Sequence, residues 1–297
     1  MNKYLTNLLL LIPGTVWGIS FIAVELILPF IPPITLTLGR SIISVVMLLF
    51  LLRLVSGTLP RKWADWWPFF ILGATNQAIP FGLVAWGQVY IEGGLASILL
   101  SIMPLFTALL AYWFTDDERL TVAKLIGIGL GLGGIVLLIG PDALAGVGKN
   151  LAAQLAIVLA ALLYAIGAVY IRKVYPLQPP GLSTWALRLR ITAAQFITSA
   201  LLLLPFSLWY DAPWTLRPTW AVMGHMLFLG VGVTLLATLV YFYLIEELGA
   251  GTASYTIYLI PVAGVLLGII ILDERLTSQM VLALGMILSG VFVANRG

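Results

Sequence analysis

Two passages of this chain, residues 94–139 and 251–294, repeat one pattern of residues. Each contains a Gly-x-Ala-Ser run, then a proline, then Asp-Glu-Arg-Leu-Thr, then two glycines. The spacing from the serine to the proline is the same in both copies, and so is the spacing from the glutamate to both glycines. A chain with this duplication is expected to fold as two equivalent halves, which we place at residues 1–140 and 150–297.

The chain is too apolar and too poor in charge to be a soluble protein. Of its 297 residues, 61% are hydrophobic and 9% are charged, whereas soluble domains are about 45–50% apolar and about 25% charged. Lipid offers backbone groups no hydrogen-bond partner, so the apolar runs must be helices. We expect ten membrane-spanning helices at residues 5–28, 33–54, 67–90, 94–114, 121–139, 151–171, 182–208, 219–245, 251–272 and 277–295. The predicted fold is an all-α integral membrane protein in contact with the lipid bilayer.

The distribution of Lys and Arg predicts the orientation, because cytoplasmic loops are enriched in both. With the N-terminus inside, the inner side carries Lys3, Arg53, Arg61, Lys62, Arg119, Lys124, Arg172, Lys173 and Arg296. The outer side carries only Lys149, Arg217 and Arg275. Five spans per half is an odd number, so the second half must be inserted upside down relative to the first. We therefore predict two inverted five-helix repeats in the inner (plasma) membrane, with both termini in the cytoplasm.

Several motifs of the chain resemble the EamA family, the ten-helix branch of the drug/metabolite transporter superfamily. They are Trp17-Gly18 with Phe21 in the first span, an arginine (Arg40) in the second, the stretch 76–81 followed by Trp86, and the repeated Gly-x-Ala-Ser run with its proline and Glu-Arg turn. The resemblance covers essentially the whole chain. It implies a carrier, mostly for export of small organic metabolites, with a central cavity between the two halves. It does not identify the substrate.

Polar residues deep in the predicted spans are candidates for contact with a substrate. Asn76 and Gln77 lie in the middle of the third span, where an amide without a partner is expensive. Ser97 and Ser101 share one face of the fourth span, and the ninth span carries Ser254 and Tyr258 at the matching positions. We expect these residues to line a shared cavity. The alternative is that the hydroxyls hydrogen-bond between helices, as small hydroxyls often do in membranes.

Charged and aromatic residues within the spans form a second set of candidates. Arg40 lies near the middle of the second span and is able to bind a carboxylate bidentately, and Arg188 and Arg190 fall in the seventh span. For each arginine, a role in holding the fold together is the alternative. Four aromatic residues that are deep or near the repeat centre could stack a substrate or simply pack against other helices: Trp17, Trp86, Tyr164 and Tyr241.

Four further residues are candidates for moving protons or moving helices. Glu25, in the first span, and His225, the sole histidine, are candidate proton carriers; the alternatives are that Glu25 snorkels to the interface and that His225 forms a structural hydrogen bond. Pro104 and Pro261 lie mid-helix at equivalent positions of the fourth and ninth spans. Each removes a backbone hydrogen bond, so we expect paired hinges that allow one half to close while the other opens.

These observations together predict a secondary-active transporter that works by alternating access and exports a small organic solute. Mid-depth arginines favour a carboxylate-bearing or zwitterionic solute such as an amino acid. The alternatives are a proton-coupled exporter of lipophilic cations that uses Glu25, and a passive channel. We expect neither an enzyme, because no catalytic constellation is present, nor a cofactor, a metal site or a nucleic-acid partner, because cysteine is absent and the basic residues are scattered singly.

Overall fold

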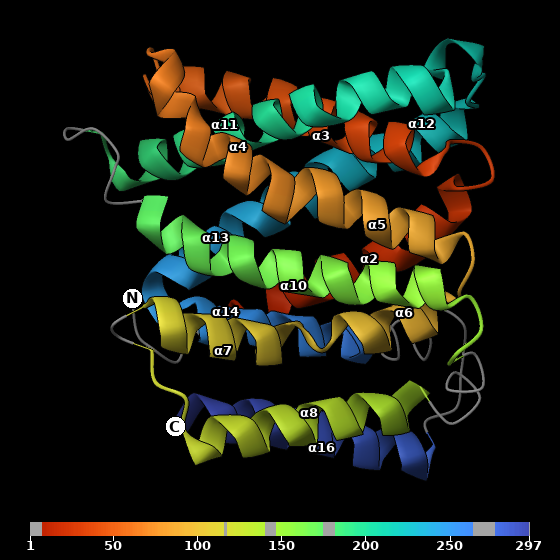
Figure 1. Cartoon of the computed structure of the whole chain (residues 1–297), viewed down its shortest axis with the longest axis vertical. Coiled ribbons are helices and arrows are strands. Elements are labelled where there is room, and N and C mark those ends of the chain that lie inside the picture. The colour runs from red at the N-terminus through yellow and green to blue at the C-terminus, as the bar shows by residue number, and fades with distance from the viewer. Residues whose placement is uncertain (1–7, 116–117, 140–146, 175–181, 264–276, 297) are drawn as a thin grey trace.

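A computed structural model describes residues 8–115, 118–139, 147–174, 182–263 and 277–296. Within these ranges the chain is almost entirely helical and contains no strand (Figure 1). The first half contains α2 (Leu11–Ile27), α3 (Pro33–Leu54), η1 (Trp63–Trp66), α4 (Trp67–Gly73), η2 (Ala74–Ala78), α5 (Ile79–Gln88), α6 (Gly93–Leu100), α7 (Met103–Phe114) and α8 (Val122–Ile139). The second contains α10 (Leu151–Val174), α11 (Thr184–Phe206), η4 (Ser207–Asp211), η5 (Pro213–Thr215), α12 (Trp220–Leu227), η6 (Phe228–Leu236), α13 (Ala237–Leu248), α14 (Ala250–Ser254), η7 (Tyr255–Tyr258) and α16 (Ser278–Arg296).

The helices match the predicted membrane spans. Six helical segments of the described chain are long and apolar enough to cross a bilayer, namely Pro33–Leu54, Trp63–Gln88, Leu95–Phe114, Leu151–Val174, Thr184–Asp211 and Trp220–Leu248. Three shorter apolar helices occupy the first, fifth and tenth predicted spans. The ninth span is described only as far as residue 263. The described part of the chain therefore confirms an all-α membrane protein.

Local sequence fixes where several of these helices begin. Proline at position 33 starts α3, where its missing N–H is not needed. The backbone N–H and the hydroxyl of Thr35 both donate to the Asp211 carboxylate, at 2.7 and 2.8 Å. The Ser183 side chain caps the amino end of α11, and the Thr219 side chain caps the amino end of α12. The first turn of α3 is thus tied to the end of α11.

Equivalent helices of the two halves pack against each other in opposite directions. Gly127, at the start of α8, lies against Ala294 at the end of α16, and Gln279 at the start of α16 donates to the Leu137 carbonyl at the end of α8. The α3 and α11 helices also pair antiparallel, because Thr35 at the start of α3 contacts Asp211 in η4, which continues the far end of α11. Both pairs can be followed in Figure 1. Antiparallel pairing of equivalent helices is what inverted repeats produce.

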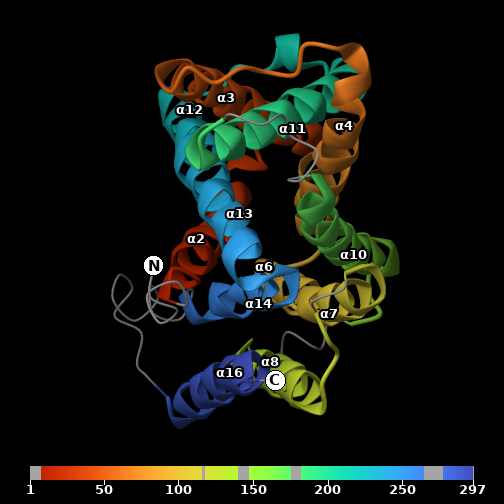
Figure 2. The same cartoon turned by 90° about the vertical axis from the view of Figure 1, so that its left-hand side faces the viewer.

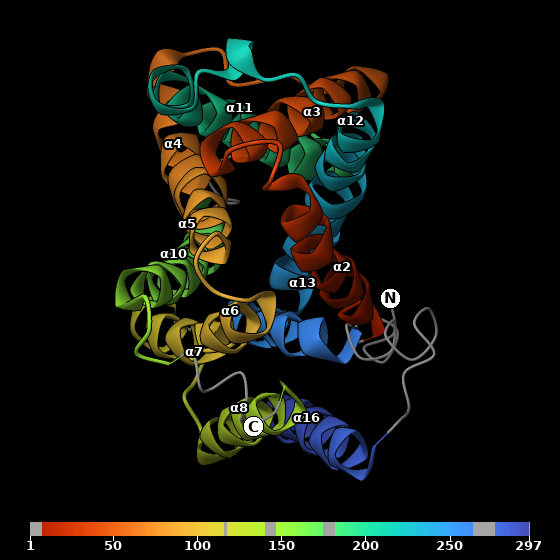
Figure 3. The same cartoon turned by 90° about the vertical axis from the view of Figure 1, so that its right-hand side faces the viewer.

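Packing between the halves is reciprocal, as a pseudo-two-fold axis requires. The first span, α2, packs against η6 and α13 of the eighth, and the sixth span, α10, packs against α4, η2 and α5 of the third. The fourth span packs against the ninth through α7 and α14. Figures 2 and 3, which view the bundle nearly along its helices, show α8 and α16 as a pair below the other helices.

Both predicted hinge prolines follow an interruption of their helix. A turn at residues 101–102 separates α6 from α7, and Pro104 lies in the first turn of α7. In the second half the 3₁₀ segment η7 interrupts the helix, which resumes at Leu259 just before Pro261. Neither proline can donate to the carbonyl four residues earlier. The two spans are thus discontinuous at equivalent places, while a hinge motion at these places stays a prediction.

Candidate substrate cavity

A cavity with an empty volume of about 680 Å³ lies in the middle of the bundle. It runs from the centre toward the side at which α2 and α5 end, because Val24 and Gln88 belong to its wall. Seven of the ten spans contribute side chains, namely the first four, the sixth, the eighth and the ninth. The wall is formed by Trp17, Ser20, Phe21, Val24, Arg40, Asn76, Phe81, Val84, Ala85, Gln88, Leu100, Met103, Tyr164, Tyr241, Ile257 and Ile260.

The cavity lies on the pseudo-two-fold axis between the halves. One register aligns the Gly94 passage with the Gly251 passage, and another aligns Trp17-Gly18 with Tyr164-Ala165. In these registers, four pairs of equivalent residues both belong to the wall: Trp17 with Tyr164, Val84 with Tyr241, Leu100 with Ile257, and Met103 with Ile260. The last two pairs flank the helix interruptions. A site built from both repeats can be reached from either half of the molecule.

Arg40 is the charged residue among the described wall residues, and it is held in place from two sides. Its Nε donates to the Thr234 hydroxyl at 2.9 Å, and its guanidinium lies over the Phe81 ring, 4.4 Å from the centroid. The side chain is buried, with 6% of the residue exposed. No carboxylate of the described residues forms an ion pair with it. A buried cation of this kind favours a negatively charged occupant.

Two π-helical segments at equivalent places serve the cavity. The segment η2, in the third span, carries Asn76, and η6, in the eighth, carries Thr234, which binds Arg40. A π-helical turn widens the helix and often marks a functional site. Gly167 of α10 allows Asn76 to sit where it does, because a Cβ at position 167 would lie 2.1 Å from the amide oxygen. The polar residues of the wall therefore depend on local backbone features.

Aromatic rings line the cavity in two edge-to-face pairs. Trp17 meets Tyr241 with centroids 5.1 Å apart, and Phe81 meets Tyr164 at 5.8 Å. Each pair joins the first or sixth span to the third or eighth, so the pairs follow the reciprocal packing of the repeats. Rings of this kind can stack the apolar body of a solute.

Three hydrogen-bonding groups of the wall have no protein partner among the described residues: Trp17 Nε1, Asn76 Nδ2 and the Tyr241 hydroxyl. All three are buried. Buried donors are ordinarily paired, with protein, water or ligand. They and the Arg40 guanidinium are hydrogen-bond donors on residues of a mainly apolar wall.

The structure brings five of the predicted substrate-binding residues to the cavity, namely Trp17, Arg40, Asn76, Tyr164 and Tyr241. The other six do not lie on its wall. Trp86 is exposed on the outer surface and packs on Tyr90. Gln77 is buried next to Asn76 but is not part of the wall. A direct role for these two residues in binding has no support from this cavity.

The predicted polar face of the fourth and ninth spans points elsewhere, for a clear physical reason. Ser101 donates to the Ser97 carbonyl and Ser254 donates to the Gly251 carbonyl, so both hydroxyls bond within their own helices. The Tyr258 hydroxyl donates to the Ile128 carbonyl, and its ring packs on α8. Of these three residues, only Tyr258 forms a hydrogen bond between two helices.

The remaining candidates also lie off the cavity wall. Glu25 and His225 are exposed, and His225 Nδ1 lies 2.8 Å from the Ala221 carbonyl oxygen. Arg188 pairs with Glu246 at 2.8 Å, and Arg190 donates to the Thr58 carbonyl. Proton carriage by Glu25 or His225 stays a prediction. Both span-7 arginines have partners outside the cavity, which favours a structural role for them.

Sequence reasoning missed most of the apolar wall. Phe21, Phe81, Leu100, Met103 and Ile257 are all cavity residues. Phe21 and Phe81 stand out in the sequence only as members of motifs, and the others are ordinary apolar residues of apolar spans. Only the repeat could have predicted some of them, because the repeat-related pairs at the helix interruptions, Leu100 with Ile257 and Met103 with Ile260, all lie on the wall.

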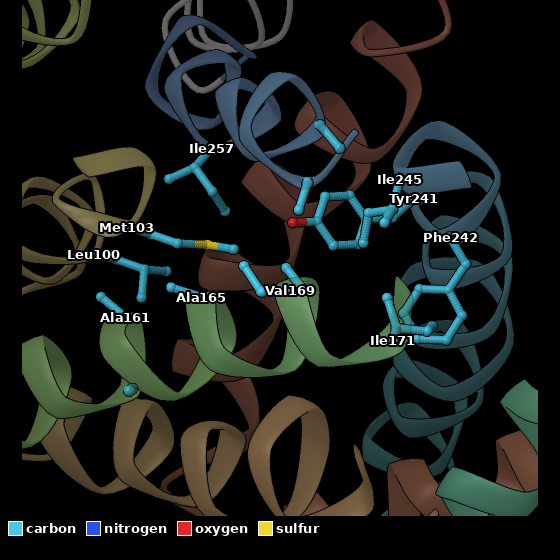
Figure 4. Packing of buried hydrophobic residues seen from close by; sticks show 14 of the residues in the cluster. Leu100, Met103, Ala161, Ala165, Val169, Ile171, Tyr241, Phe242, Ile245 and Ile257 are labelled. Atoms are coloured by element: carbon cyan, nitrogen blue, oxygen red, sulfur yellow. The ribbon is translucent and has the colours of Figure 1, made fainter. Parts of the chain in front are cut away.

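On the opposite side of the bundle centre, the counterparts of the wall residues are sealed. In the same registers, Phe21 and Val24 correspond to Ala168 and Ile171 of α10. Ala85 and Gln88 correspond to Phe242 and Ile245 of α13. The four sealed residues are Ala168, Ile171, Phe242 and Ile245, and each is at most 1% exposed. Figure 4 shows Ile171 of α10 beside Phe242 of α13. The cavity thus extends toward one end of the bundle, while the equivalent residues at the other end are packed together.

Comparison with known proteins agrees with this architecture. The EamA-like transporter family matches residues 5–140 and 151–296. An uncharacterized transporter of Archaeoglobus fulgidus is 28% identical over 282 residues, covering 95% of each chain. The protein PecM of Dickeya dadantii is 26% identical over 280 residues, covering 94% of this chain and 89% of its own.

An inner membrane transporter of Escherichia coli, YedA, is 24% identical and covers 95% of this chain and 88% of its own. A solved crystal structure superimposes with a TM-score of 0.75 at 18% identity, covering 98% of this chain and 95% of the other, which shows the shared fold. Two family matches that together span nearly the whole sequence leave one conclusion about its ancestry: the chain belongs to the EamA-like transporter family.

Proposed function

We propose that this protein is a secondary-active transporter that moves a small, carboxylate-bearing or zwitterionic metabolite, such as an amino acid, out of the cytoplasm. The observation that carries the proposal is Arg40, a buried cation on the cavity wall without a carboxylate partner among the described residues. Arg40 would bind the carboxylate, because a guanidinium matches it with two parallel hydrogen bonds. The aromatic pairs would hold the rest of the solute.

Alternating access would follow from the repeats. The cavity extends toward one end of the bundle, while the equivalent residues at the other end are packed. Exchanging the conformations of two inverted repeats would open the packed end and close the open one, around the same central site. Such an exchange moves a solute without a continuous pore, which distinguishes the proposal from a channel.

The rival proposal, a proton-coupled exporter of lipophilic cations, has less support. A cationic solute needs a carboxylate or aromatic faces, and the described wall carries aromatic rings but no carboxylate and places the Arg40 guanidinium among them. Glu25 is exposed and does not belong to the wall. Electrostatic repulsion by Arg40 would disfavour a cation in this cavity.

Ligand-dependent thermal unfolding of the purified protein tests the substrate class. The panel contains amino acids, other carboxylates, nucleobases and cationic dyes. A ligand that binds only the folded state raises the unfolding temperature in proportion to its occupancy. We expect carboxylate-bearing compounds to stabilise the protein, and Arg40→Met to abolish the effect. Stabilisation by cationic dyes alone would overturn the proposal.

Counterflow in proteoliposomes tests the mode of transport. Vesicles loaded with an unlabelled compound from the panel should transiently accumulate the labelled compound, because a carrier exchanges one molecule for another. The rate should saturate with concentration. A channel would give neither accumulation nor saturation in this range.

Single cysteines test the proposed orientation, since the chain contains no cysteine of its own. Thr115 follows α7 and Ser278 begins α16, and the inverted repeats place them at opposite ends of the bundle. With both termini cytoplasmic, a membrane-impermeant thiol reagent added to intact cells should label Ser278→Cys and leave Thr115→Cys unlabelled. The reverse result would invert the proposed orientation.

A further inference from the structure

Glu118 ties together three segments that are far apart in the sequence. It lies in the connection between α7 and α8. Its Oε1 accepts hydrogen bonds from the Ala250 N–H at 2.7 Å and from Arg172 Nη1 at 3.1 Å, and its Oε2 accepts one from the Gly251 N–H at 2.9 Å. One carboxylate thus links the first half to the end of α10 and to the start of α14. Charge-assisted hydrogen bonds of this kind are the strong ones.

The backbone around Glu118 is shaped to receive it. A Cβ at Gly251 would lie 2.4 Å from Oε2, and the side chain of Glu118 is the only group within 4 Å of that position among the described residues. Gly249 adopts φ +86°, and a Cβ there would lie 2.8 Å from Oε1. Only glycine fits at both positions without moving the carboxylate. The Glu118 side chain itself is 10% exposed.

This contact lies at the sealed end of the bundle. Arg172 follows the sealed residue Ile171 directly on α10, and Gly249 follows the end of α13, which carries Phe242 and Ile245. In Figure 2 the connection from α7 to α8, the end of α13 and the start of α14 all lie at the end of the bundle that faces the viewer. Glu118 therefore crosses the seam between the halves where the cavity is closed.

We propose that Glu118 is a gate residue: its bonds to Arg172 and to the amino end of α14 hold this end of the transporter closed, and they must break before the end opens. The inference rests on the alternating access proposed above. It adds the contact that stabilises the conformation in which this end is closed. To open this end, α10 and α13 must separate from the seam. Glu118 binds both the end of α10 and the start of α14, and α14 directly follows α13. Separating α10 from α13 therefore has to break at least one of the hydrogen bonds of Glu118.

The gate is not the same at the two ends. In the register of the first spans, the residue that corresponds to Arg172 is Glu25. Glu25 lies near the start of α6, with its Oε2 3.9 Å from the Cβ position of Gly93. The cation that binds Glu118 is therefore not repeated on α2. This difference favours the conformation in which the Glu118 end is closed.

Thiol labelling of purified protein tests the gate. Two single-cysteine reporters are introduced into the cysteine-free chain, Ala168→Cys at the sealed end and Gln88→Cys on the open wall. Each is combined with Glu118→Gln, which keeps the shape of the side chain and removes its charge. We expect the labelling rate at position 168 to rise about tenfold, equivalent to a population shift of about 1.4 kcal/mol, and the rate at position 88 to fall.

A second variant reaches the same contact by another route. Gly251→Ala places a Cβ against the Glu118 carboxylate and should displace the carboxylate. Alanine itself favours the helical conformation of α14, so the change does not disturb the helix. Gly251→Ala should therefore change both labelling rates in the same direction as Glu118→Gln. Glu246→Gln is the matched control, because it removes a carboxylate that pairs with Arg188 at the same end and has no hydrogen bond to α14 among the described residues. It should change neither rate.

The outcomes separate the gate from the transport function. If position 168 labels at the original rate in both Glu118→Gln and Gly251→Ala, and both variants elute as folded monodisperse protein, Glu118 is not a gate residue. If both variants are unfolded, Glu118 holds the fold together and the inference also fails. Counterflow by the unmutated protein decides the transport function separately, so a transporting protein with unresponsive reporters refutes the gate alone.

Discussion

Replacing Arg40 with methionine should weaken substrate binding about a hundredfold and leave the free energy of unfolding almost unchanged. Arg40 is a buried cation without an ion-pair partner among the described residues, and burying an ion costs several kcal/mol even after relaxation. Methionine has a similar length and no charge. The substitution therefore removes an unfavourable term from the folded protein that contains no substrate.

The interactions that Arg40→Met removes are comparable in free energy with the cost of burying the charge. The hydrogen bond from Nε to Thr234 contributes about 1.5–3 kcal/mol, and the contact with the Phe81 ring contributes up to about 2 kcal/mol at a desolvated site. Gains and losses nearly cancel, so the free energy of unfolding should change by no more than about 1 kcal/mol. Binding loses two charge-assisted hydrogen bonds, or about 3 kcal/mol, which raises Kd about a hundredfold.

Denaturant or thermal unfolding in detergent measures the first quantity, and titration with the best-binding carboxylate of the panel measures the second. Arg40→Lys keeps the charge without the planar fork, so it should retain part of the affinity and part of the transport. Arg188→Met is the control, because Arg188 pairs with Glu246 outside the cavity. If Arg40→Met destabilises the protein by several kcal/mol, Arg40 is structural and the argument for an anionic substrate fails.

Other predictions concern packing, the wall and the interruptions. Gly127→Ala places a Cβ 2.5 Å from the backbone of α16 and should lower the free energy of unfolding by about 1–3 kcal/mol, whereas Gly129→Ala, with open space around it, should not lower it. Tyr241→Phe removes a hydroxyl without a described partner, so affinity should fall while the unfolding temperature does not. Pro104→Ala and Pro261→Ala should each slow counterflow and preserve the fold. The two variants should shift the accessibility of single cysteines at the two ends of the cavity in opposite directions. Normal transport with unchanged accessibility would contradict the hinge interpretation.

The sequence by itself determined the architecture. Apolar length defined the spans, because a membrane helix must cover the hydrocarbon core and bond its own backbone. The duplicated passage and the odd number of spans per half predicted the inverted repeats, which the antiparallel pairing of α8 with α16 confirms. The matched prolines marked the places where two spans are interrupted, since proline lacks the N–H that a continuous helix needs.

Only the tertiary structure decided which side chains face the cavity. In a soluble helix the polar face reports the direction of solvent, but these helices are apolar on every side and the usual periodicity is missing. The hydroxyl of Ser101 bonds to its own helix, and Tyr258 fits against Gly131 of α8, so neither lines the cavity despite its position in the repeat. Leu100 and Met103 do line it, because the interruption between α6 and α7 turns their side chains toward the centre. The direction of a side chain inside a membrane protein is set by its neighbours, and those neighbours come from distant parts of the chain.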